Sequence, residues 1–180
     1  ALITMEQKEA AVPLFERIVA EYPSGRYGPQ SQFTLGDYYY GLKDYTNATA
    51  SYERFLELFP VDKLEGRDRQ LVGKAETLLG HLAEIDAYNL YAQGEILFDK
   101  KDYEEAVEIF RQVQVKYPES DQAVNALVNI GAAYMAQEEY RQAGAVFQEV
   151  VDKYSESSKY LQQVDFSRQQ LEVMQEARVL

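Results

Sequence analysis

The side chains that most often carry out chemistry in proteins are scarce in this chain. Cysteine is absent, and histidine occurs once, as His81. A zinc site needs three or four converging ligands, so His81 is interpreted as an ordinary helix residue. A serine or threonine nucleophile needs a neighbouring base, and no glycine-rich phosphate-binding motif occurs. We therefore predict that the protein is not an enzyme and has no catalytic residues, no metal and no cofactor.

Carboxylates are abundant, with 30 Asp and Glu against 18 Lys and Arg, and the formal net charge is −12. The pairs Glu104-Glu105 and Glu138-Glu139 fall where helices are predicted to begin, and negative charge there complements the helix dipole. A phosphate backbone requires a basic footprint, so we expect no nucleic-acid partner. No apolar run reaches the roughly 18 residues of a membrane helix, so we expect no direct membrane insertion by this segment.

A repeat organises most of the chain. An aromatic residue followed by Pro or Ser recurs at Tyr22, Phe59, Tyr117 and Tyr154, at intervals of 37, 58 and 37 residues. An Ala precedes each of these by eleven residues and a ring precedes each by seven, at Ala11, Ala48, Ala106 and Ala143 and at Phe15, Tyr52, Phe110 and Phe147. Offsets of three and four place such residues on one face of a helix.

A second helix is predicted ahead of this one in the last three units. It carries a small residue twelve positions before the Ala, at Gly36, Gly94 and Gly131, where a neighbouring backbone can come close. Short turns begin at Lys43, Lys101 and Glu138 and separate the two helices. Each unit is therefore helix A, a turn, helix B and a break. The first unit lacks its helix A, and Ala1 is interpreted as a processed or excised beginning.

These columns predict a single domain over residues 1–180. It has a partial unit at about 1–24, complete units at 25–61, 84–119 and 120–156, and a capping helix at 157–178. The 21 extra residues predict a helical extension over 62–83, since no proline lies between Arg67 and Asp99. Apolar residues of the capping helix are expected to cover the last repeat, at Tyr160, Leu161, Val164, Phe166, Leu171, Val173 and Met174, and glutamines to face solvent, at Gln162, Gln163, Gln169 and Gln170.

The pattern Gly…Tyr-x-x-Ala-x-x-x-Phe…Tyr-Pro resembles the tetratricopeptide repeat over about four fifths of the chain. The resemblance implies an all-α fold, a right-handed α-α superhelix with a concave face, ended by the C-terminal capping helix. The period is 37 residues instead of roughly 34. This longer period resembles bacterial cell-envelope proteins of the Tol-Pal-associated periplasmic type and the outer-membrane assembly lipoprotein type. The bulky residue four before each glycine is Gln32, Leu90 or Leu127 instead of the family's Trp.

In the family, helix A lines the concave groove, and the resemblance implies groove positions here. They are Phe33, Asp37, Tyr40, Tyr88, Tyr91, Glu95 and Phe98, flanked by Asn125 and Asn129. The Lys and Asn clamp by which some members hold a carboxylate is missing, because Phe33 and Tyr91 replace Lys and Glu95 replaces Asn. Aromatic rings with isolated acids suit an apolar or aromatic peptide that carries positive charge. The alternative, that these rings pack against neighbouring helices, is equally supported.

The function that follows is a non-catalytic scaffold or adaptor that binds a protein segment in a bacterial envelope complex. The resemblance places it in the periplasm or envelope, with the cytoplasm as the alternative. Two other functions stay open: a substrate-positioning arm of a larger enzyme, and a structural module that self-assembles into homo-oligomers. The identity of the partner is not encoded in any motif.

Overall fold

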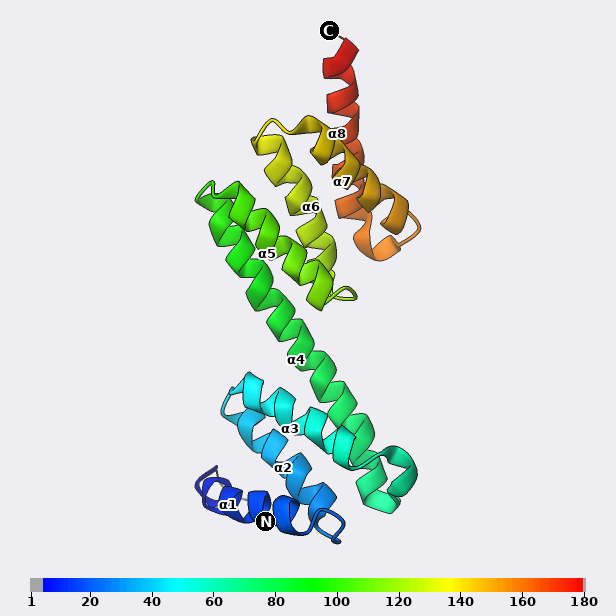
Figure 1. The fold of residues 1–180 in the computed structure, drawn as a ribbon. Helices are drawn as coiled ribbons and strands as arrows, with labels where there is room; N and C mark the ends of the chain where they lie inside the picture. The colour runs from blue at the N-terminus through cyan, green and yellow to red at the C-terminus, as the bar shows by residue number, and fades with distance from the viewer. Residues whose placement is uncertain (1–4, 180) are drawn as a thin grey trace. The chain divides into compact units, whose positions relative to one another are not determined.

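A computed structural model describes residues 5–179, with side chains for residues 9–176. Residues 1–4 and 180 of the predicted domain lie outside this range. Every regular element between residues 5 and 179 is helical, which confirms the all-α prediction (Figure 1). The α-helices are α1 Met5–Glu21, α2 Gly28–Gly41, α3 Tyr45–Leu58, α4 Gly66–Asp99, α5 Tyr103–Lys116, α6 Asp121–Ala136, α7 Tyr140–Tyr154 and α8 Leu161–Val179.

The chain divides into two compact units, residues 1–82 and 83–180. In unit 1, α1 packs on α2 and α2 on α3. The core of unit 1 is built from α2, α3 and the first half of α4, around Phe33, Tyr52, Phe55, Ala75 and Leu82. Tyr52 and Phe55 are fully buried because they lie three residues apart on the inner face of α3. The prediction that the chain forms a single domain stays a prediction.

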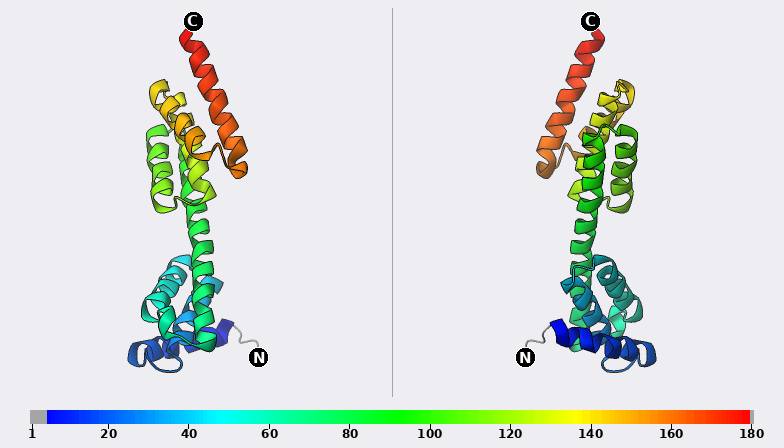
Figure 2. Two further views of the ribbon diagram at one scale, coloured as in Figure 1. Left: turned by 90° about the vertical axis from the view of Figure 1, so that its right-hand side faces the viewer. Right: turned by 90° about the vertical axis from the view of Figure 1, so that its left-hand side faces the viewer.

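Unit 2 holds the second half of α4 together with α5, α6, α7 and α8. Helix α6 lies between α5 and α7, and α8 lies alongside α7 (Figures 1 and 2). Its core centres on Phe110, Val113 and Ile130, and a smaller cluster joins Leu127 to Val164 of α8. The helices begin and end where the repeat columns indicate, with Ser120 capping α6 by accepting a hydrogen bond from the Ala123 N–H at 3.2 Å.

The extra residues between the second and third units form part of one helix. Helix α4 runs for 34 residues without interruption, from Gly66 to Asp99. Leu71 and Ala75 in its first half are buried in unit 1, and Leu90 and Leu97 in its second half pack in the core of unit 2. The two halves of α4 therefore pack in different cores.

Glycine allows the close contact inside each helix pair. A Cβ built on Gly36 would lie 2.4 Å from the Tyr52 ring, and one on Gly94 would lie 2.5 Å from the Phe110 ring. The same contact at Gly131 is 2.6 Å from Phe147. Real Cβ atoms cannot come this close, so each ring of helix B lies directly on the bare backbone of helix A. The predicted packing role of the three glycines is confirmed.

The turn between helix A and helix B has the same backbone geometry in three units. Lys43, Lys101 and Glu138 have φ angles of 60°, 68° and 62°. Each of these turns closes with two backbone hydrogen bonds, for example from Lys43 N–H to Tyr40 O and from Asp44 N–H to Tyr39 O, both 3.0 Å. This is the Schellman arrangement, which usually favours glycine at the left-handed residue. The turns reverse the chain so that helix B packs back on helix A.

Candidate functional site

The inner-face positions predicted in unit 1 are largely used by the fold itself. Phe33 is 5% exposed, and its ring centroid lies 5.4 Å from that of Tyr52 and 5.7 Å from that of Phe55. The expectation that Phe33 faces a partner is therefore wrong, because the side chain is part of the core. Tyr40 is half-buried against Tyr45, at 6.1 Å between centroids.

Asp37 is the inner-face carboxylate of unit 1, and it has a partner within the unit. The Tyr52 hydroxyl donates a hydrogen bond to Asp37 Oδ1 at 2.7 Å. Burial, and after it this bond to a carboxylate, raises the pKa of Tyr52 above its ordinary value. A shallow hollow of about 490 Å³ beside Asp37 is bordered by Phe33, Lys74 and Leu78. The inner-face positions predicted in unit 1 therefore offer one partly engaged carboxylate, and the Phe33 ring is buried.

In unit 2 the predicted residues of α4 lie in two environments. Tyr88 is 60% exposed, and Glu95 is exposed as well. Tyr91 is half-buried with its ring 5.5 Å from Phe110, and Phe98 is half-buried with its ring 5.3 Å from Tyr103. Burial and the nearby Glu95 carboxylate raise the pKa of Tyr91. Tyr91 and Phe98 thus contribute to the core edge, whereas Tyr88 is available on the surface.

Side-chain amides form hydrogen bonds that link α6 to α4 and to α8. Asn129 Nδ2 donates to the Tyr91 hydroxyl of α4 at 2.9 Å. Gln163 Nε2 of α8 donates to Asn125 Oδ1 at 2.8 Å. Asn125 and Asn129 are both half-buried. The two predicted asparagines are therefore brought together with Tyr91 on one side of α4, α6 and α8, which we call the unit-2 inner face.

Helix α8 adds to this face two apolar residues that the sequence analysis placed elsewhere. Leu161 and Val173 are each 51% exposed, so they do not cover the last repeat as expected. Phe166 is 40% exposed and covers the last repeat with one edge of its ring. Val164 and the small Ser167 are fully buried instead, and Gln163 does not face solvent freely. Phe166 follows Gln163 by one turn, and Val173 follows Phe166 by two. The repeat period of 37 residues contains a signal for this position, because Phe166 stands 37 residues after Asn129.

The Phe166 ring is fixed at the edge of the unit-2 core. Its centroid lies 6.0 Å from that of Phe147, with the rings inclined at 73°. Such an edge-on pair is favourable and holds the exposed ring in place. Tyr88 belongs to the same set of inner-face columns, since it precedes Asn125 by 37 residues. Two exposed rings, a valine and two asparagines therefore define the candidate site.

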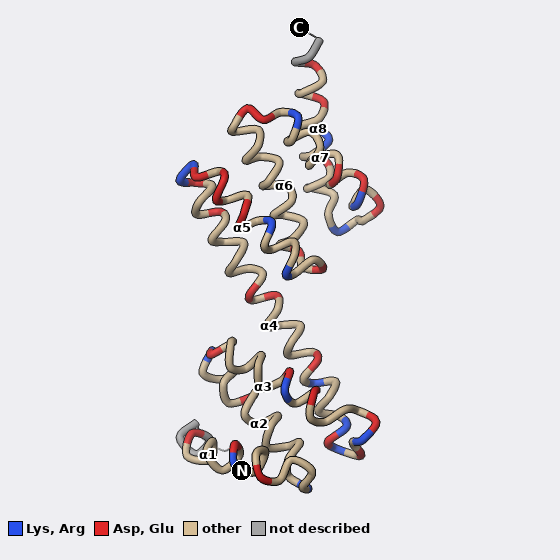
Figure 3. Tube along the Cα trace, in the orientation of Figure 1, with Lys and Arg blue, Asp and Glu red and all other residues tan. Residues whose placement is uncertain are grey.

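The charges that α4 and α6 bring to unit 2 are few and acidic. Helix α6 contains no Lys or Arg, and its one charged residue is Asp121 at the N-terminus (Figure 3). The second half of α4, from Ala83 to Asp99, carries only acidic charges. Among residues 9–176 no three His, Asp or Glu side chains gather as a metal site. The arrangement therefore suits recognition of a neutral or basic polypeptide.

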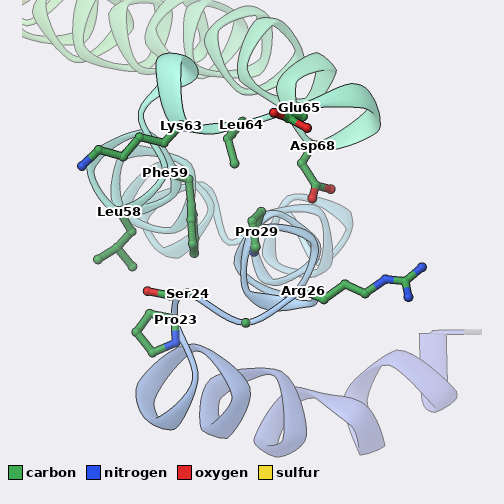
Figure 4. A pocket seen from close by; sticks show the side chains of 11 residues that line it. Pro23, Ser24, Arg26, Pro29, Leu58, Phe59, Lys63, Leu64, Glu65 and Asp68 are labelled. Carbon is green, nitrogen blue, oxygen red and sulfur yellow. The ribbon is translucent and has the colours of Figure 1, made fainter.

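A separate hollow of about 480 Å³ lies at the turns of unit 1 (Figure 4). Phe59, Leu64 and Pro29 border it, and Asp68 points towards Pro29. The side chains of Arg26 and Lys63 extend outwards, away from one another. No sequence motif predicted a site here, and the charged side chains do not converge on one point.

A family model matches most of the chain. The family described as YfiO, outer membrane lipoprotein, matches residues 3–67 and 83–177. The solved structure of a MamA RS-1 double mutant is 20% identical, with a TM-score of 0.36, covering 95% of this chain and 81% of that one. MamA from Desulfovibrio magneticus RS-1 is 19% identical, with a TM-score of 0.35 and coverage of 94% and 81%. A search of curated proteins gave no match.

No helix within the described range is both long enough and apolar enough to cross a membrane.

Proposed function

The chain belongs to the YfiO family of outer membrane lipoproteins, and from this premise we propose that it is a non-catalytic scaffold that binds a protein segment in a bacterial envelope complex. The segment contacts the unit-2 inner face. The observation that carries the proposal is the exposure of Tyr88, Phe166 and Val173 beside the half-buried Asn125 and Asn129. Large apolar side chains that are exposed together on one face are typical of protein recognition surfaces.

The exposed rings have no structural task that explains their size. Tyr88 contributes little to the core at 60% exposure, and an Ala there would preserve the helix. Phe166 packs one edge on Phe147 and leaves the rest of the ring accessible. Aromatic anchors of this kind dominate interfaces, and truncating a true hot spot costs about 2 kcal/mol or more in binding. Tyr91 and Phe98 serve mainly to hold the face in shape.

Photocrosslinking in cells tests the proposal with an internal control. A benzoylphenylalanine in place of Tyr88 or Phe166 should form an adduct with an envelope protein, and the same group in place of Val115 should not. Val115 on α5 is 81% exposed, so it is more accessible than either ring but lies on a helix B. Tyr88→Ala in the purified protein should then weaken binding of the captured protein about 30-fold and change the melting temperature little, because the side chain is 60% exposed. Adducts of equal yield from Val115 would refute the proposal.

The two alternatives predict different results. A self-assembly module forms adducts with copies of its own chain from the same positions, and its light scattering rises with protein concentration. An arm of a larger enzyme forms intramolecular adducts or adducts with the enzyme's substrate. No residue contact in either unit favours these functions over a scaffold.

A further inference from the structure

We propose that unit 1 binds a small zwitterion, a molecule with both an ammonium and a carboxylate group, in a hollow between α1 and α3. Amino acids and dipeptides have this pair of charges. The hollow, here called the α1–α3 hollow, has a volume of about 330 Å³, which is within the range of small-molecule sites. It lies on a different side of α2 from Phe33 and Asp37. The inference is therefore independent of the unit-2 inner face.

Three helices build the α1–α3 hollow, and its floor is apolar. Val19 of α1 and Leu35 of α2 border it and are 6% and 5% exposed. The residues that α1 and α3 contribute recur every three or four positions, so each helix presents one face as a wall. Glu16 stands on the α1 wall, and Arg54 stands on the α3 wall. An apolar floor between a carboxylate and a guanidinium is the framework of the site.

The two charged side chains of the walls are available to a ligand. Both Glu16 and Arg54 are exposed. Among residues 9–176 neither forms an ion pair, whereas the neighbouring Arg17 pairs with Glu21 at 3.1 Å. A guanidinium can hold a carboxylate through two parallel hydrogen bonds, and a carboxylate can accept from an ammonium group. The two walls therefore suit opposite charges of one molecule.

Gln32 of α2 adds a polar group at the base of the hollow. The residue is 3% exposed and borders the hollow. Its Nε2 donates to Ser51 O at 2.9 Å, which fixes the amide between α2 and α3. Its Oε1 accepts no hydrogen bond from residues 9–176, and a buried amide oxygen without a donor is unfavourable. The ammonium group of a ligand would supply the missing donor.

Unit 2 contains the same arrangement of three helices, with apolar residues at the corresponding base. Residues of α5, α6 and α7 stand 95 positions after their counterparts in α1, α2 and α3, as Gly131 stands after Gly36. Leu127 takes the place of Gln32, and Val146 takes the place of Ser51. Both of these side chains pack in the clusters of the unit-2 core. The amide at the base is therefore a feature of unit 1 and not a requirement of the repeat.

The polar groups of the walls also differ between the two units. Arg111 takes the place of Glu16 and donates to the Tyr134 hydroxyl at 3.0 Å. Glu149 takes the place of Arg54 and pairs with Lys153. Tyr39, the counterpart of Tyr134, borders the α1–α3 hollow and forms no side-chain hydrogen bond with the described residues. These positions are thus engaged within unit 2 and left free in unit 1.

The positions of these groups define the ligand. Its ammonium group contacts the Glu16 carboxylate and Gln32 Oε1, and its carboxylate contacts the Arg54 guanidinium. An apolar substituent covers Val19 and Leu35 on the floor. A molecule with one charge satisfies only one wall, and a molecule with two charges of the same sign is repelled by the other wall.

Isothermal titration calorimetry of the intact protein with leucine and with leucylleucine tests the inference. The two probes distinguish a single amino acid from a dipeptide. The N-acetylated form of each probe lacks the ammonium group, and the amidated form lacks the carboxylate. We expect saturable binding of one free probe and affinity weaker by about tenfold or more for both of its blocked forms, since each loses one charged contact.

Three variants assign the binding to the α1–α3 hollow. Glu16→Gln should weaken binding of the free probe by about tenfold or more and should not weaken binding of the N-acetylated form further. Glu53→Gln removes a carboxylate from an exposed residue of α3 outside the hollow and should leave binding unchanged. Gln32→Leu with Ser51→Val introduces the residues of unit 2 and should abolish binding, with the helical circular dichroism spectrum retained.

Three results would overturn the inference. One is the absence of saturable heat with either free probe in a wild type that has its native circular dichroism spectrum. Equal affinity for the free and blocked probes would show that only the apolar floor takes part. Equal losses for Glu16→Gln and Glu53→Gln would reduce the effect to the net charge of the protein. Each of these results leaves the proposed function standing, because crosslinking from Tyr88 and Phe166 tests that function separately.

Discussion

The inner faces of unit 1 and unit 2 occupy the same columns of the repeat but end in different states. In unit 1, Phe33 is buried and Asp37 is bonded to Tyr52. In unit 2, Tyr91 takes the place of Phe33 and is half-buried, and Glu95 has no hydroxyl from helix B, because Phe110 stands where unit 1 has Tyr52. The hydroxyl near Glu95 is that of Tyr91 on its own helix. The ring that helix B supplies therefore decides whether the inner-face carboxylate is bonded across the helix pair.

Two glycines of α4 also occupy the same repeat column and differ in their contacts. Gly94, in its second half, is covered by the Phe110 ring. Gly73, in its first half, stands 37 residues after Gly36 and so occupies the same column, yet a Cβ there would meet nothing within 4 Å. A repeat column thus predicts where a contact can form, and the presence of a following helix B decides whether it does.

The largest expected effect is on the free energy of unfolding, when a buried ring is compared with an exposed one. Phe33→Ala should lower the free energy of unfolding by about 3–5 kcal/mol, since it empties a buried site. Tyr88→Ala should change it by no more than about 0.5 kcal/mol, since the ring is mostly exposed. Urea unfolding followed by circular dichroism measures both. Similar losses for the two variants would contradict the contrast between the faces.

The hydroxyl of Tyr52 should have a smaller but clear effect. Tyr52→Phe should lower stability by about 1–2 kcal/mol, because the Asp37 carboxylate loses its donor. Phe110→Tyr is the reciprocal change and should direct a hydroxyl towards Glu95, the residue that follows Gly94 as Asp37 follows Gly36. A double-mutant cycle of Tyr52→Phe with Asp37→Asn isolates the bond. A coupling energy near zero would show that the bond does not stabilise unit 1.

The two glycines of α4 should respond in opposite directions. Gly94→Ala should destabilise the protein by about 1–2 kcal/mol, because the new methyl group collides with the buried Phe110 ring. Gly73→Ala should stabilise it by about 0.5–1 kcal/mol, since alanine favours the helix and nothing obstructs the methyl group. Thermal unfolding of the two variants gives the sign directly. A loss of stability for Gly73→Ala would mean that this glycine has a contact.

The sequence was sufficient to predict the repeat, but it did not predict which side chains of the candidate site are exposed. Periodic columns predicted the helix pairs, the turns and the glycine contacts, because these depend on local geometry and on one neighbour. How deeply Phe33 and Tyr91 are buried depends on the rings that the facing helix supplies, which no single column shows. Phe166 and Val173 were assigned to the core from their apolar character alone, although the repeat register places Phe166 37 residues after Asn129 and so marks its face.

Low pH should destabilise unit 2 by weakening the contact between α6 and the residues directly before α8. The Asp121 carboxylate forms an ion pair with Lys159 and accepts a hydrogen bond from the Tyr160 hydroxyl at 2.8 Å. The Lys159 contact first, and Tyr160 second, lowers the pKa of Asp121 below its ordinary value. A carboxyl group whose pKa is lower in the folded state stabilises the fold above its unfolded pKa of about 3.9, and this contribution disappears as the pH falls through the folded value.

Asp121→Asn should therefore lower the melting temperature slightly at pH 6, and its melting temperature should converge with that of the wild type at the acidic end of the titration. Asp165→Asn is the control, because Asp165 pairs with Arg168 inside α8 at 3.6 Å and makes no link to α6. Parallel melting curves of wild type and Asp121→Asn at every pH would show that this carboxylate does not hold α8 in place.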